Sequence, residues 1–277
     1  MIDFIIVGNG LAGISFAEIA LQNNKSIFVF DNNSQPSSRV AGGLYNPVVL
    51  KRFSEVWKAK EQLEIAFPLY KAIEEKLSIT FDYKIPIYRR LASVEEQNNW
   101  FQAADKPNLA PFLSSSLISE KLSNINSSFG FGEVLETGYL DIASLIQNYS
   151  NYLIQNNLYS SERFEYDLIE FKDEFITYKN IKAKHIIFAE GFGLHSNPFF
   201  NNLPLDGTKG ELLVIKAPNL DLKIVVKSNI FILPLGNDLY KVGATYDWKD
   251  KTNNPTEDGK KEIVDNLSDF DKRRLYL

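Results

Sequence analysis

The sequence predicts an α/β fold in which a parallel-sheet domain is interleaved along the chain with an antiparallel-sheet α+β domain. Three observations support this prediction. An apolar run at 4–7, a helical pattern at 14–21 and a second apolar run at 27–30 form a β-α-β unit. A further buried strand is expected at 185–189. Several strand-like runs then follow Gly210 in close succession, which is typical of an antiparallel sheet.

The first β-α-β unit carries three glycines at the G-x-G-x-x-G spacing, namely Gly8, Gly10 and Gly13. The first glycine permits a tight turn, the second lets a pyrophosphate approach the backbone, and the third lets the helix pack closely on the strand. Asp31 ends the second strand, where an acid accepts hydrogen bonds from both ribose hydroxyls and repels a 2′-phosphate. This context predicts a Rossmann-like dinucleotide site. A glycine-rich turn without a ligand is the alternative.

Composition excludes several classes of function. The chain has 277 residues, a net charge of −5 and no cysteine, so disulfides, thiolate catalysis and cysteine metal sites are excluded. Its two histidines fall in no metal-binding pattern, so we expect no metal site. The acidic balance makes nucleic acid an improbable partner. Without a signal peptide or a run of about 18 apolar residues, we expect a cytoplasmic protein that does not enter a membrane.

Periodicity and turn residues predict the remaining elements. Helices are expected at 53–77, divided or kinked at Pro68, at 94–104, at 141–156 and at 256–267. Strands are expected at 83–91, 165–171, 174–178, 211–216, 223–226, 230–235 and 239–245, with loops and short pieces over 105–132. Ser93 and Glu96 form a capping box for the second helix. Asn237-Asp238 is expected to turn the last hairpin.

Five ordered stretches resemble the FAD-dependent D-amino-acid oxidase and glycine oxidase family. They are G-N-G-L-A-G with Asp31, S-R-V-A-G-G-L at 38–44, K-H-I-I-F-A-E-G at 184–191, L-P-L-D-G-T-K-G-E-L-L-V-I at 203–215, and I-F-I-L-P-L-G-N-D-L-Y-K-V-G-A-T-Y at 230–246. The resemblance implies a GR2-type FAD-binding domain at 1–82 and 139–204, and a substrate or cap domain at 83–138 and 205–277.

The resemblance also implies which residues contact FAD. By this resemblance, Leu168 lies in the first strand of a hairpin and offers its backbone groups to the adenine. The full expected set is Gly8, Gly10, Leu11, Ala12, Gly13, Asp31, Asn32, Ser38, Arg39, Ala41, Gly42, Gly43, Leu44, Leu168, Ala189, Glu190 and Gly191. Without the family resemblance, Gly42-Gly43 would be interpreted as an ordinary tight turn in a loop.

The family's chemistry is hydride transfer to the flavin from the carbon next to an amine nitrogen. The expected partners are therefore a small amine or amino acid and oxygen or another electron acceptor. Where these oxidases have a tyrosine for the substrate carboxylate, this chain has Phe231, which cannot donate that hydrogen bond. Tyr240 and Tyr246 are the other candidates for the substrate pocket. The sequence gives no catalytic residue and no oligomeric state.

The chain also departs from the family at its end. It stops before the family's G-x-R-P strand and last glycine-rich strand, so we expect weakened FAD binding. Three alternatives follow: a tRNA-modification oxidase of the same family, a truncated non-catalytic nucleotide-binding remnant, and a dehydrogenase that uses NAD alone. The acidic composition argues against the first, despite the basic clusters Lys51-Arg52 and Lys272-Arg273-Arg274. The later motifs argue against the last.

Overall fold

The chain folds into two compact units, each assembled from three segments. The computed structural model describes residues 1–119, 122, 125, 127–268 and 270. Unit 1 comprises Met1–Ala41, Pro68–Phe81 and Asp141–Gly207, and unit 2 comprises Gly42–Phe67, Asp82–Leu140 and Thr208–Leu277. The sequence-based division assigned residues 42–67 to the cofactor domain, whereas their strands pair within unit 2. The basic cluster at 272–274 lies outside the described residues.

Unit 1 is organised around one six-stranded sheet. Its strands are β1 Ile2–Val7, β2 Ile27–Phe30, β11 Tyr159–Ser160, β12 Ile169–Phe171, β13 Ile176–Tyr178 and β14 Ile181–Phe188. They lie in the order β11-β2-β1-β14-β13-β12. The first four are parallel, and β13 and β12 add as an antiparallel hairpin. The strongly apolar β1 is therefore a central strand, paired on both sides.

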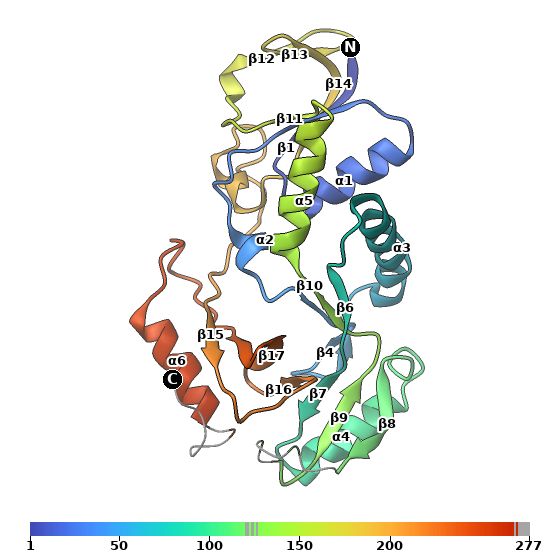
Figure 1. Ribbon diagram of the computed structural model, residues 1–277, viewed down its shortest axis with the longest axis vertical. Coiled ribbons are helices and arrows are strands. Elements are labelled where there is room, and N and C mark those ends of the chain that lie inside the picture. The colour runs from blue at the N-terminus through green and yellow to red at the C-terminus, as the bar shows by residue number, and fades with distance from the viewer. Residues whose placement is uncertain (120–121, 123–124, 126, 269, 271–277) are drawn as a thin grey trace. The chain divides into compact units, whose positions relative to one another are not determined.

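Two helices cover this sheet. Helix α1, Leu11–Gln22, joins β1 to β2, and α5, Ile142–Gln155, is capped by Asp141, whose carboxylate accepts the Ser144 N–H at 3.1 Å. The two helices lie beside each other in Figure 1. Helix α5 agrees with the helix predicted at 141–156, because its apolar residues recur at helical spacing on the buried face. The unit also contains a short helix α2, Ser37–Val40, the 3₁₀ turns η1, Tyr166–Leu168, and η2, Gly191–Ser196, and the part of helix α3, Ala59–Leu77, that begins at Pro68.

The hairpin of unit 1 is shorter than predicted. The predicted strand at 165–171 begins only at Ile169, because the residues before it form the turn η1, which places Leu168 outside the strand. Strand β11 was not predicted at all, since two residues carry no periodicity. Tyr178 and Phe164 stack at a ring-centroid distance of 4.1 Å and pack under β1 and β2 in the core of the unit.

Unit 2 contains a seven-stranded sheet. Its strands, in sheet order, are β15 Leu212–Lys216, β18 Leu239–Gly243, β17 Phe231–Gly236, β16 Val225–Lys227, β7 Ile87–Arg90, β9 Phe131–Val134 and β8 Leu113–Ile118. All neighbours are antiparallel except β16 and β7. The four strands predicted after Gly210 are confirmed. Asn237 and Asp238 turn the hairpin at φ values of +52° and +62°.

The two faces of this sheet are buried in separate cores. One core contains Phe231 and Leu233 together with Trp100 of α4, Val94–Ala104. The other contains Ile232 and Val242 together with the buried side of α6, Glu257–Ser268, which lies beside β15 (Figure 1). Neighbouring residues of β17 therefore point into different cores, as the alternation of a strand requires.

Smaller elements fill the rest of unit 2. A three-stranded sheet has the order β3 Leu44–Tyr45, β10 Gly138–Leu140, β6 Asp82–Lys84, and β4 Val48–Val49 pairs with β5 Ser54–Glu55. The predicted helix at 53–77 begins only at α3, Ala59–Leu77, and the predicted strand at 83–91 is divided between β6 and β7. Helix α3 has 19 residues, yet no helix in the described ranges has the length and apolar character to cross a membrane.

The cap of α4 makes the first testable prediction. Ser93 Oγ accepts the backbone N–H of Glu96 at 3.1 Å, and the Glu96 carboxylate accepts the N–H of Ala92 at 2.8 Å. We expect Ser93→Ala to lower the free energy of unfolding by about 1 kcal/mol, because a helix N–H loses its partner. Urea unfolding measures this change. The control is Ser115→Ala at an exposed position of β8, which should change stability little.

Candidate functional site

The glycine-rich turn after β1 is shaped by contacts of backbone with backbone. Gly8 has a φ of +102°, and a Cβ there would lie 2.4 Å from the carbonyl oxygen of Ala189. A Cβ at Gly13 would lie 2.0 Å from the carbonyl oxygen of Gly8. At Gly10 the nearest atom to a Cβ would be Ser38 Oγ, at 3.2 Å. Protein packing therefore requires Gly8 and Gly13, whereas a Cβ at Gly10 would meet only the flexible side chain of Ser38.

Asp31 ties the end of β2 to this turn. Its carboxylate accepts the backbone N–H of Asn9 at 2.5 Å and also that of Asn33. A carboxylate has about four lone-pair positions, so acceptor capacity remains for a ligand. The Asn9 amide donates to Ser150 Oγ at 2.8 Å, while Asn9 Oδ1 is buried without a partner among the described residues.

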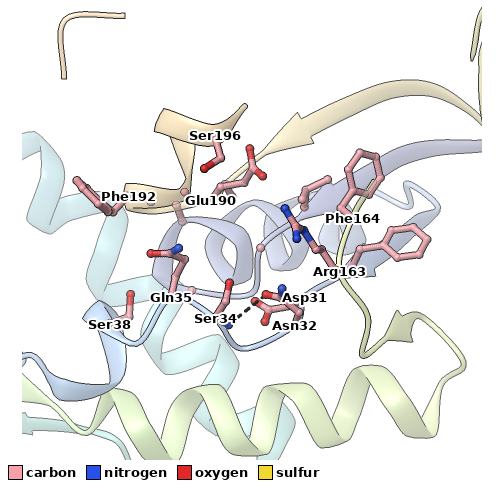
Figure 2. Close-up of a pocket in the computed structure, with 18 of the residues that line it drawn as sticks. Asp31, Asn32, Ser34, Gln35, Ser38, Arg163, Phe164, Glu190, Phe192 and Ser196 are labelled. Carbon is pink, nitrogen blue, oxygen red and sulfur yellow. Dashed lines mark hydrogen bonds between the residues drawn. The ribbon is translucent and has the colours of Figure 1, made fainter. Parts of the chain in front are cut away.

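A cavity of about 360 Å³ opens above the turn and lies entirely within unit 1. In Figure 2, Asp31, Asn32 and Ser34 lie along one side of it, and Glu190 and Ser196 lie opposite. Its lining residues are Val7, Gly8, Gly10, Leu11, Ala12, Phe30, Asp31, Asn32, Ser34, Gln35, Ser37, Ser38, Glu162, Arg163, Phe164, Tyr166, Ala189, Glu190, Gly191, Phe192, Gly193 and Ser196. Four chain segments thus meet at this cavity, and they follow the carboxyl ends of β1, β2, β11 and β14.

The structure brings most of the predicted cofactor residues of unit 1 together around this cavity. Those that line it are Gly8, Gly10, Leu11, Ala12, Asp31, Asn32, Ser38, Ala189, Glu190 and Gly191. Four others of unit 1 do not line it, namely Gly13, Arg39, Ala41 and Leu168. Gly13 is buried beneath the turn, and Arg39 donates to Asn33 Oδ1. Leu168 is 44% exposed.

Sequence reasoning missed the segment Glu162–Tyr166. This segment reaches the cavity because β11 pairs in parallel with β2, opposite Val29 and Phe30, and then runs past Asp31. Arg163 is the one cation of the described lining, beside the carboxylates of Asp31, Glu162 and Glu190. No local motif marks these residues. The polar residues Ser34, Gln35 and Ser37 also line the cavity, and their position shortly after Asp31 in the sequence could have predicted this.

Glu190 is held in place by two donors. Tyr166 Oη donates to one carboxylate oxygen, and Asn197 Nδ2 donates to the other at 2.7 Å. Burial raises the pKa of Tyr166 above its usual range, and the Glu190 carboxylate raises it further. Tyr166 therefore stays protonated at neutral pH and remains a hydrogen-bond donor. The pair fixes the turn that follows β14 on the wall of the cavity.

The second predicted glycine pair has contacts of its own in unit 2. A Cβ at Gly42 would lie 2.7 Å from Cζ of Phe231, and one at Gly43 would lie 2.2 Å from the carbonyl oxygen of Leu140. Gly43 also has a φ of +73°. Protein packing thus explains both glycines, and Leu44 begins β3 directly after them. A flavin contact of 42–44 stays a prediction.

The two tyrosine candidates lie apart from Phe231. Phe231 and Tyr240 belong to the cores on opposite faces of the sheet, and Tyr240 Oη accepts the N–H of Leu222 at 3.3 Å. The two side chains therefore point to different faces of the sheet, and the role of Tyr240 in a substrate pocket stays a prediction. Tyr246 lies beyond β18 and is 71% exposed.

The cavity offers hydrogen-bond donors and room for a dinucleotide. Helix α1 begins at the cavity with no side-chain cap and no acid in its first turn. Its first N–H groups and its positive dipole end therefore suit a diphosphate. Gly10 leaves room for such a group, and Asp31 stands at the end of the neighbouring strand, where a ribose lies in folds of this kind.

Comparison with known proteins decides the family. The sequence profile of the DAO family, described as FAD dependent oxidoreductase, matches residues 3–271. The chain belongs to this family. Members bind FAD, and their common fold combines a parallel-rich sheet with a mostly antiparallel second sheet.

Solved structures of this fold include two glycine oxidases and an L-proline dehydrogenase. Glycine oxidase from Geobacillus kaustophilus matches with a TM-score of 0.77 and 15% identity over 100% of this chain and 80% of its own. Glycine oxidase from Bacillus cereus gives 0.76 and 16% over 100% and 83%. L-Proline dehydrogenase from P. horikoshii gives 0.72 and 12% over 99% and 79%. At these identities the match establishes the α/β fold.

Curated relatives share a shorter stretch of sequence with this chain. The bifunctional protein MnmC for tRNA 5-methylaminomethyl-2-thiouridine biosynthesis, from Campylobacter jejuni subsp. doylei, is 27% identical over 119 residues. That match covers 41% of this chain and 19% of the relative. The chain thus spans about a fifth of the length of the curated relatives that it matches.

Proposed function

We propose that this chain binds FAD in the cavity of unit 1 and oxidises a C–N bond of a small amine or amino acid. The observation that carries the proposal is the combination of an open glycine turn at Gly10, an uncapped N-terminus of α1 and the Asp31 carboxylate on one cavity. Membership of the DAO family supports the identity of the cofactor. The named activities of the similar structures support the C–N bond as the target.

Different residues of the cavity would bind different parts of FAD. The N–H groups of Leu11 and Ala12 at the start of α1 would hold the diphosphate, and Asp31 would accept the ribose hydroxyls. Arg163 and Phe164 would flank the adenosine end. The bound FAD supplies the acceptor for the hydride that leaves the carbon next to nitrogen. The protein's task is to orient the substrate and to exclude water from the reacting atoms.

The role of unit 2 in this proposal is to bind the substrate. Phe231 lies against Gly42, at the start of the segment 42–44 that the family resemblance assigns to the flavin. Its ring would provide an apolar wall for the substrate. Oxygen or another acceptor would reoxidise the cofactor.

A visible absorption spectrum tests the cofactor. Purified protein, with FAD added and the free cofactor then removed, should show the flavin bands at about 370 and 450 nm. Anaerobic bleaching of the second band by amines or amino acids would then test the reaction. Absence of both bands after reconstitution would contradict FAD binding by this chain.

Gly10→Ala gives the sharper prediction for this cavity. The added methyl group meets only the flexible Ser38 side chain in the protein, so the fold should be preserved. It would project toward the diphosphate, and we expect FAD affinity to fall at least about tenfold, or about 1.4 kcal/mol. Quenching of FAD fluorescence on titration measures this affinity.

The matched control is Gly210→Ala in unit 2. A Cβ there has no neighbour closer than 3.4 Å, so the substitution adds the same methyl group at a residue that does not line the cavity. Wild-type affinity is expected for this control. Unchanged affinity in Gly10→Ala would place the diphosphate elsewhere.

A second candidate function is oxidation of an amine carried by tRNA. The names of the curated relatives favour it. The net charge of −5 argues against it, because RNA binding rests largely on neutralising phosphates. Lys51 and Arg52 are exposed in unit 2 and are available for such contacts. A gel shift with tRNA that weakens as salt rises would support this candidate, and no shift at low salt would remove it.

A further inference from the structure

The loop that follows β2 takes part in holding the Asp31 carboxylate. This carboxylate accepts one backbone N–H group on each of its oxygens, that of Asn9 on Oδ2 and that of Asn33 on Oδ1. Two donors on two oxygens fix the plane of a carboxylate, and the directions of its remaining lone pairs are then fixed as well. The orientation of Asp31 therefore depends on how firmly the N–H groups of Asn9 and Asn33 are held.

The two donors are held in different ways. Asn9 belongs to the glycine turn, and its side chain, which is 4% exposed, donates to Ser150 Oγ of α5 at 2.8 Å. Asn33 is exposed, and it lies with residues 32–35 outside any helix or strand. Its φ of +57° is a left-handed conformation that asparagine adopts more readily than most residues. The position of Asn33 therefore depends on the contacts of its own side chain.

Arg39 of the short helix α2 makes such a contact. Its guanidinium Nη2 donates to Asn33 Oδ1, which ties the start of the loop to α2. Arg39 itself does not line the cavity of unit 1. The loop that it closes does, along the side of the cavity where Asp31 lies (Figure 2), through Asn32, Ser34, Gln35, Ser37 and Ser38.

Tyr159 of β11 supports the same loop. Its hydroxyl donates to the backbone carbonyl oxygen of Asp31 at 3.4 Å. Burial raises the pKa of Tyr159, and the charge of Asp31 raises it further. Hydrogen bonding with the side chains of Ser161 and Asn33 opposes this rise in pKa, and so does the charge of Arg39. The Asn33 side chain therefore contacts both the Arg39 guanidinium and the Tyr159 hydroxyl.

We propose that Arg39 is a positioning residue, which acts through Asn33 to hold the Asp31 carboxylate in the orientation that receives the two ribose hydroxyls. The inference rests on the proposed function, because that function places the ribose of the cofactor at Asp31. The family resemblance implies instead that Arg39 contacts the cofactor. The two roles differ in the part of the ligand on which the effect of Arg39 depends.

Two nucleotides that differ only in their ribose hydroxyls test the proposal. ADP contains the adenosine and the diphosphate of the proposed cofactor, and 2′,3′-dideoxy-ADP lacks both hydroxyls. Isothermal titration calorimetry of the full chain, freed of FAD, gives the dissociation constant of each. The ratio of the two constants reports the contact between the hydroxyls and Asp31. We expect the wild type to bind ADP at least about tenfold more tightly, because a buried acceptor built for a hydroxyl rejects the analogue without it.

Arg39→Met is expected to reduce this preference at least about threefold, with little change in the affinity for 2′,3′-dideoxy-ADP. Asn33→Gly should act in the same way. Glycine accepts a φ of +57° and keeps the N–H that Asp31 binds, but it removes the acceptor of the Arg39 bond. Arg39→Lys keeps a cationic donor and should restore most of the preference. In an Asp31→Asn background, Arg39→Met should have no further effect, because the group on which it acts is gone.

Lys25→Met is the matched control, since it removes the charge of another exposed cation of unit 1 that does not line the cavity. It should keep the wild-type preference. A preference that Arg39→Met leaves unchanged overturns the proposal. An equal loss of affinity for both nucleotides also overturns it, because that result is expected if Arg39 contacts the cofactor directly or if the variant only disturbs the fold.

Failure of the proposed function gives a different result. If the wild type prefers ADP over 2′,3′-dideoxy-ADP but takes up no FAD, the proposed function fails, and the ratio still decides the role of Arg39. If the wild type takes up FAD and Arg39→Met keeps the preference, the function stands and the role of Arg39 is refuted. If neither nucleotide nor FAD binds, both proposals fail, because no ribose then reaches Asp31.

Discussion

Gly13→Ala is expected to abolish folding of unit 1. The new Cβ would lie 2.0 Å from the carbonyl oxygen of Gly8 and 3.6 Å from the Cβ of Ala189. The first contact is with backbone, so α1 would have to move away from β1. That movement would break the approach of α1 to the central strand of the sheet, and we expect a loss of more than about 4 kcal/mol in the free energy of unfolding.

Soluble expression and thermal unfolding of Gly13→Ala measure this loss. Gly10→Ala adds the same methyl group three residues earlier, where it meets only Ser38 Oγ at 3.2 Å, and serves as the control. We expect Gly10→Ala to unfold at nearly the wild-type temperature. A Gly13→Ala protein as stable as Gly10→Ala would mean that α1 tolerates a greater distance from β1.

The contrast between these glycines shows how far the sequence motif predicts the site. G-x-G-x-x-G and Asp31 lie within one β-α-β unit, so their arrangement follows from local geometry. The Asp31 carboxylate indeed reaches back to the Asn9 N–H at 2.5 Å. The motif does not distinguish glycines that the protein needs for packing from the one that faces the cavity. For Gly8 and Gly10 that distinction depends on Ala189 and Ser38, which come from other segments.

The opposite wall of the cavity could not be predicted from local sequence. Glu162 and Arg163 reach it through the register of β11 on β2, which only two paired residues define. Such a short pairing has no hydrophobic period that a window along the chain could detect. Glu190 was predicted, because the family resemblance marks the end of β14, but its two donors Tyr166 and Asn197 were not.

Unit 2 shows a second reason for missed strands. Strand β8 and the first two residues of β9 lie in the region 105–132 that was predicted as loops and short pieces, and β8 contains three consecutive serines at 114–116. In β9, Gly132 faces Trp100, where a Cβ would lie 2.3 Å from the indole ring. Tertiary packing selects glycine there against its low strand propensity. The context of α4 therefore decides a strand that propensity would reject.

Packing around α1 also depends on a buried acid that no motif predicted. Glu18 is 1% exposed, and its carboxylate accepts the Lys76 ammonium of α3 at 2.5 and 2.6 Å. Tyr149 Oη of α5 donates to it at 3.1 Å, and Gln22 Nε2 at 3.0 Å. Burial raises the pKa of Tyr149 far above its usual range, and the charge of Glu18 adds to this, so its hydroxyl remains a donor. One carboxylate thus joins three helical segments of unit 1.

We expect Lys76→Met to lower the free energy of unfolding by about 3–5 kcal/mol, because it leaves the Glu18 carboxylate buried without a counter-charge. Urea unfolding measures the change. Lys71→Met, which removes a lysine 77% exposed and paired with Glu75 at 3.9 Å, should cost less than about 1 kcal/mol. Combining Lys76→Met with Glu18→Gln should recover most of the loss, since the buried charge is then gone. If Lys76→Met and Lys71→Met are equally stable, Glu18 is neutralised in some other way, and the junction of α1, α3 and α5 does not depend on this ion pair.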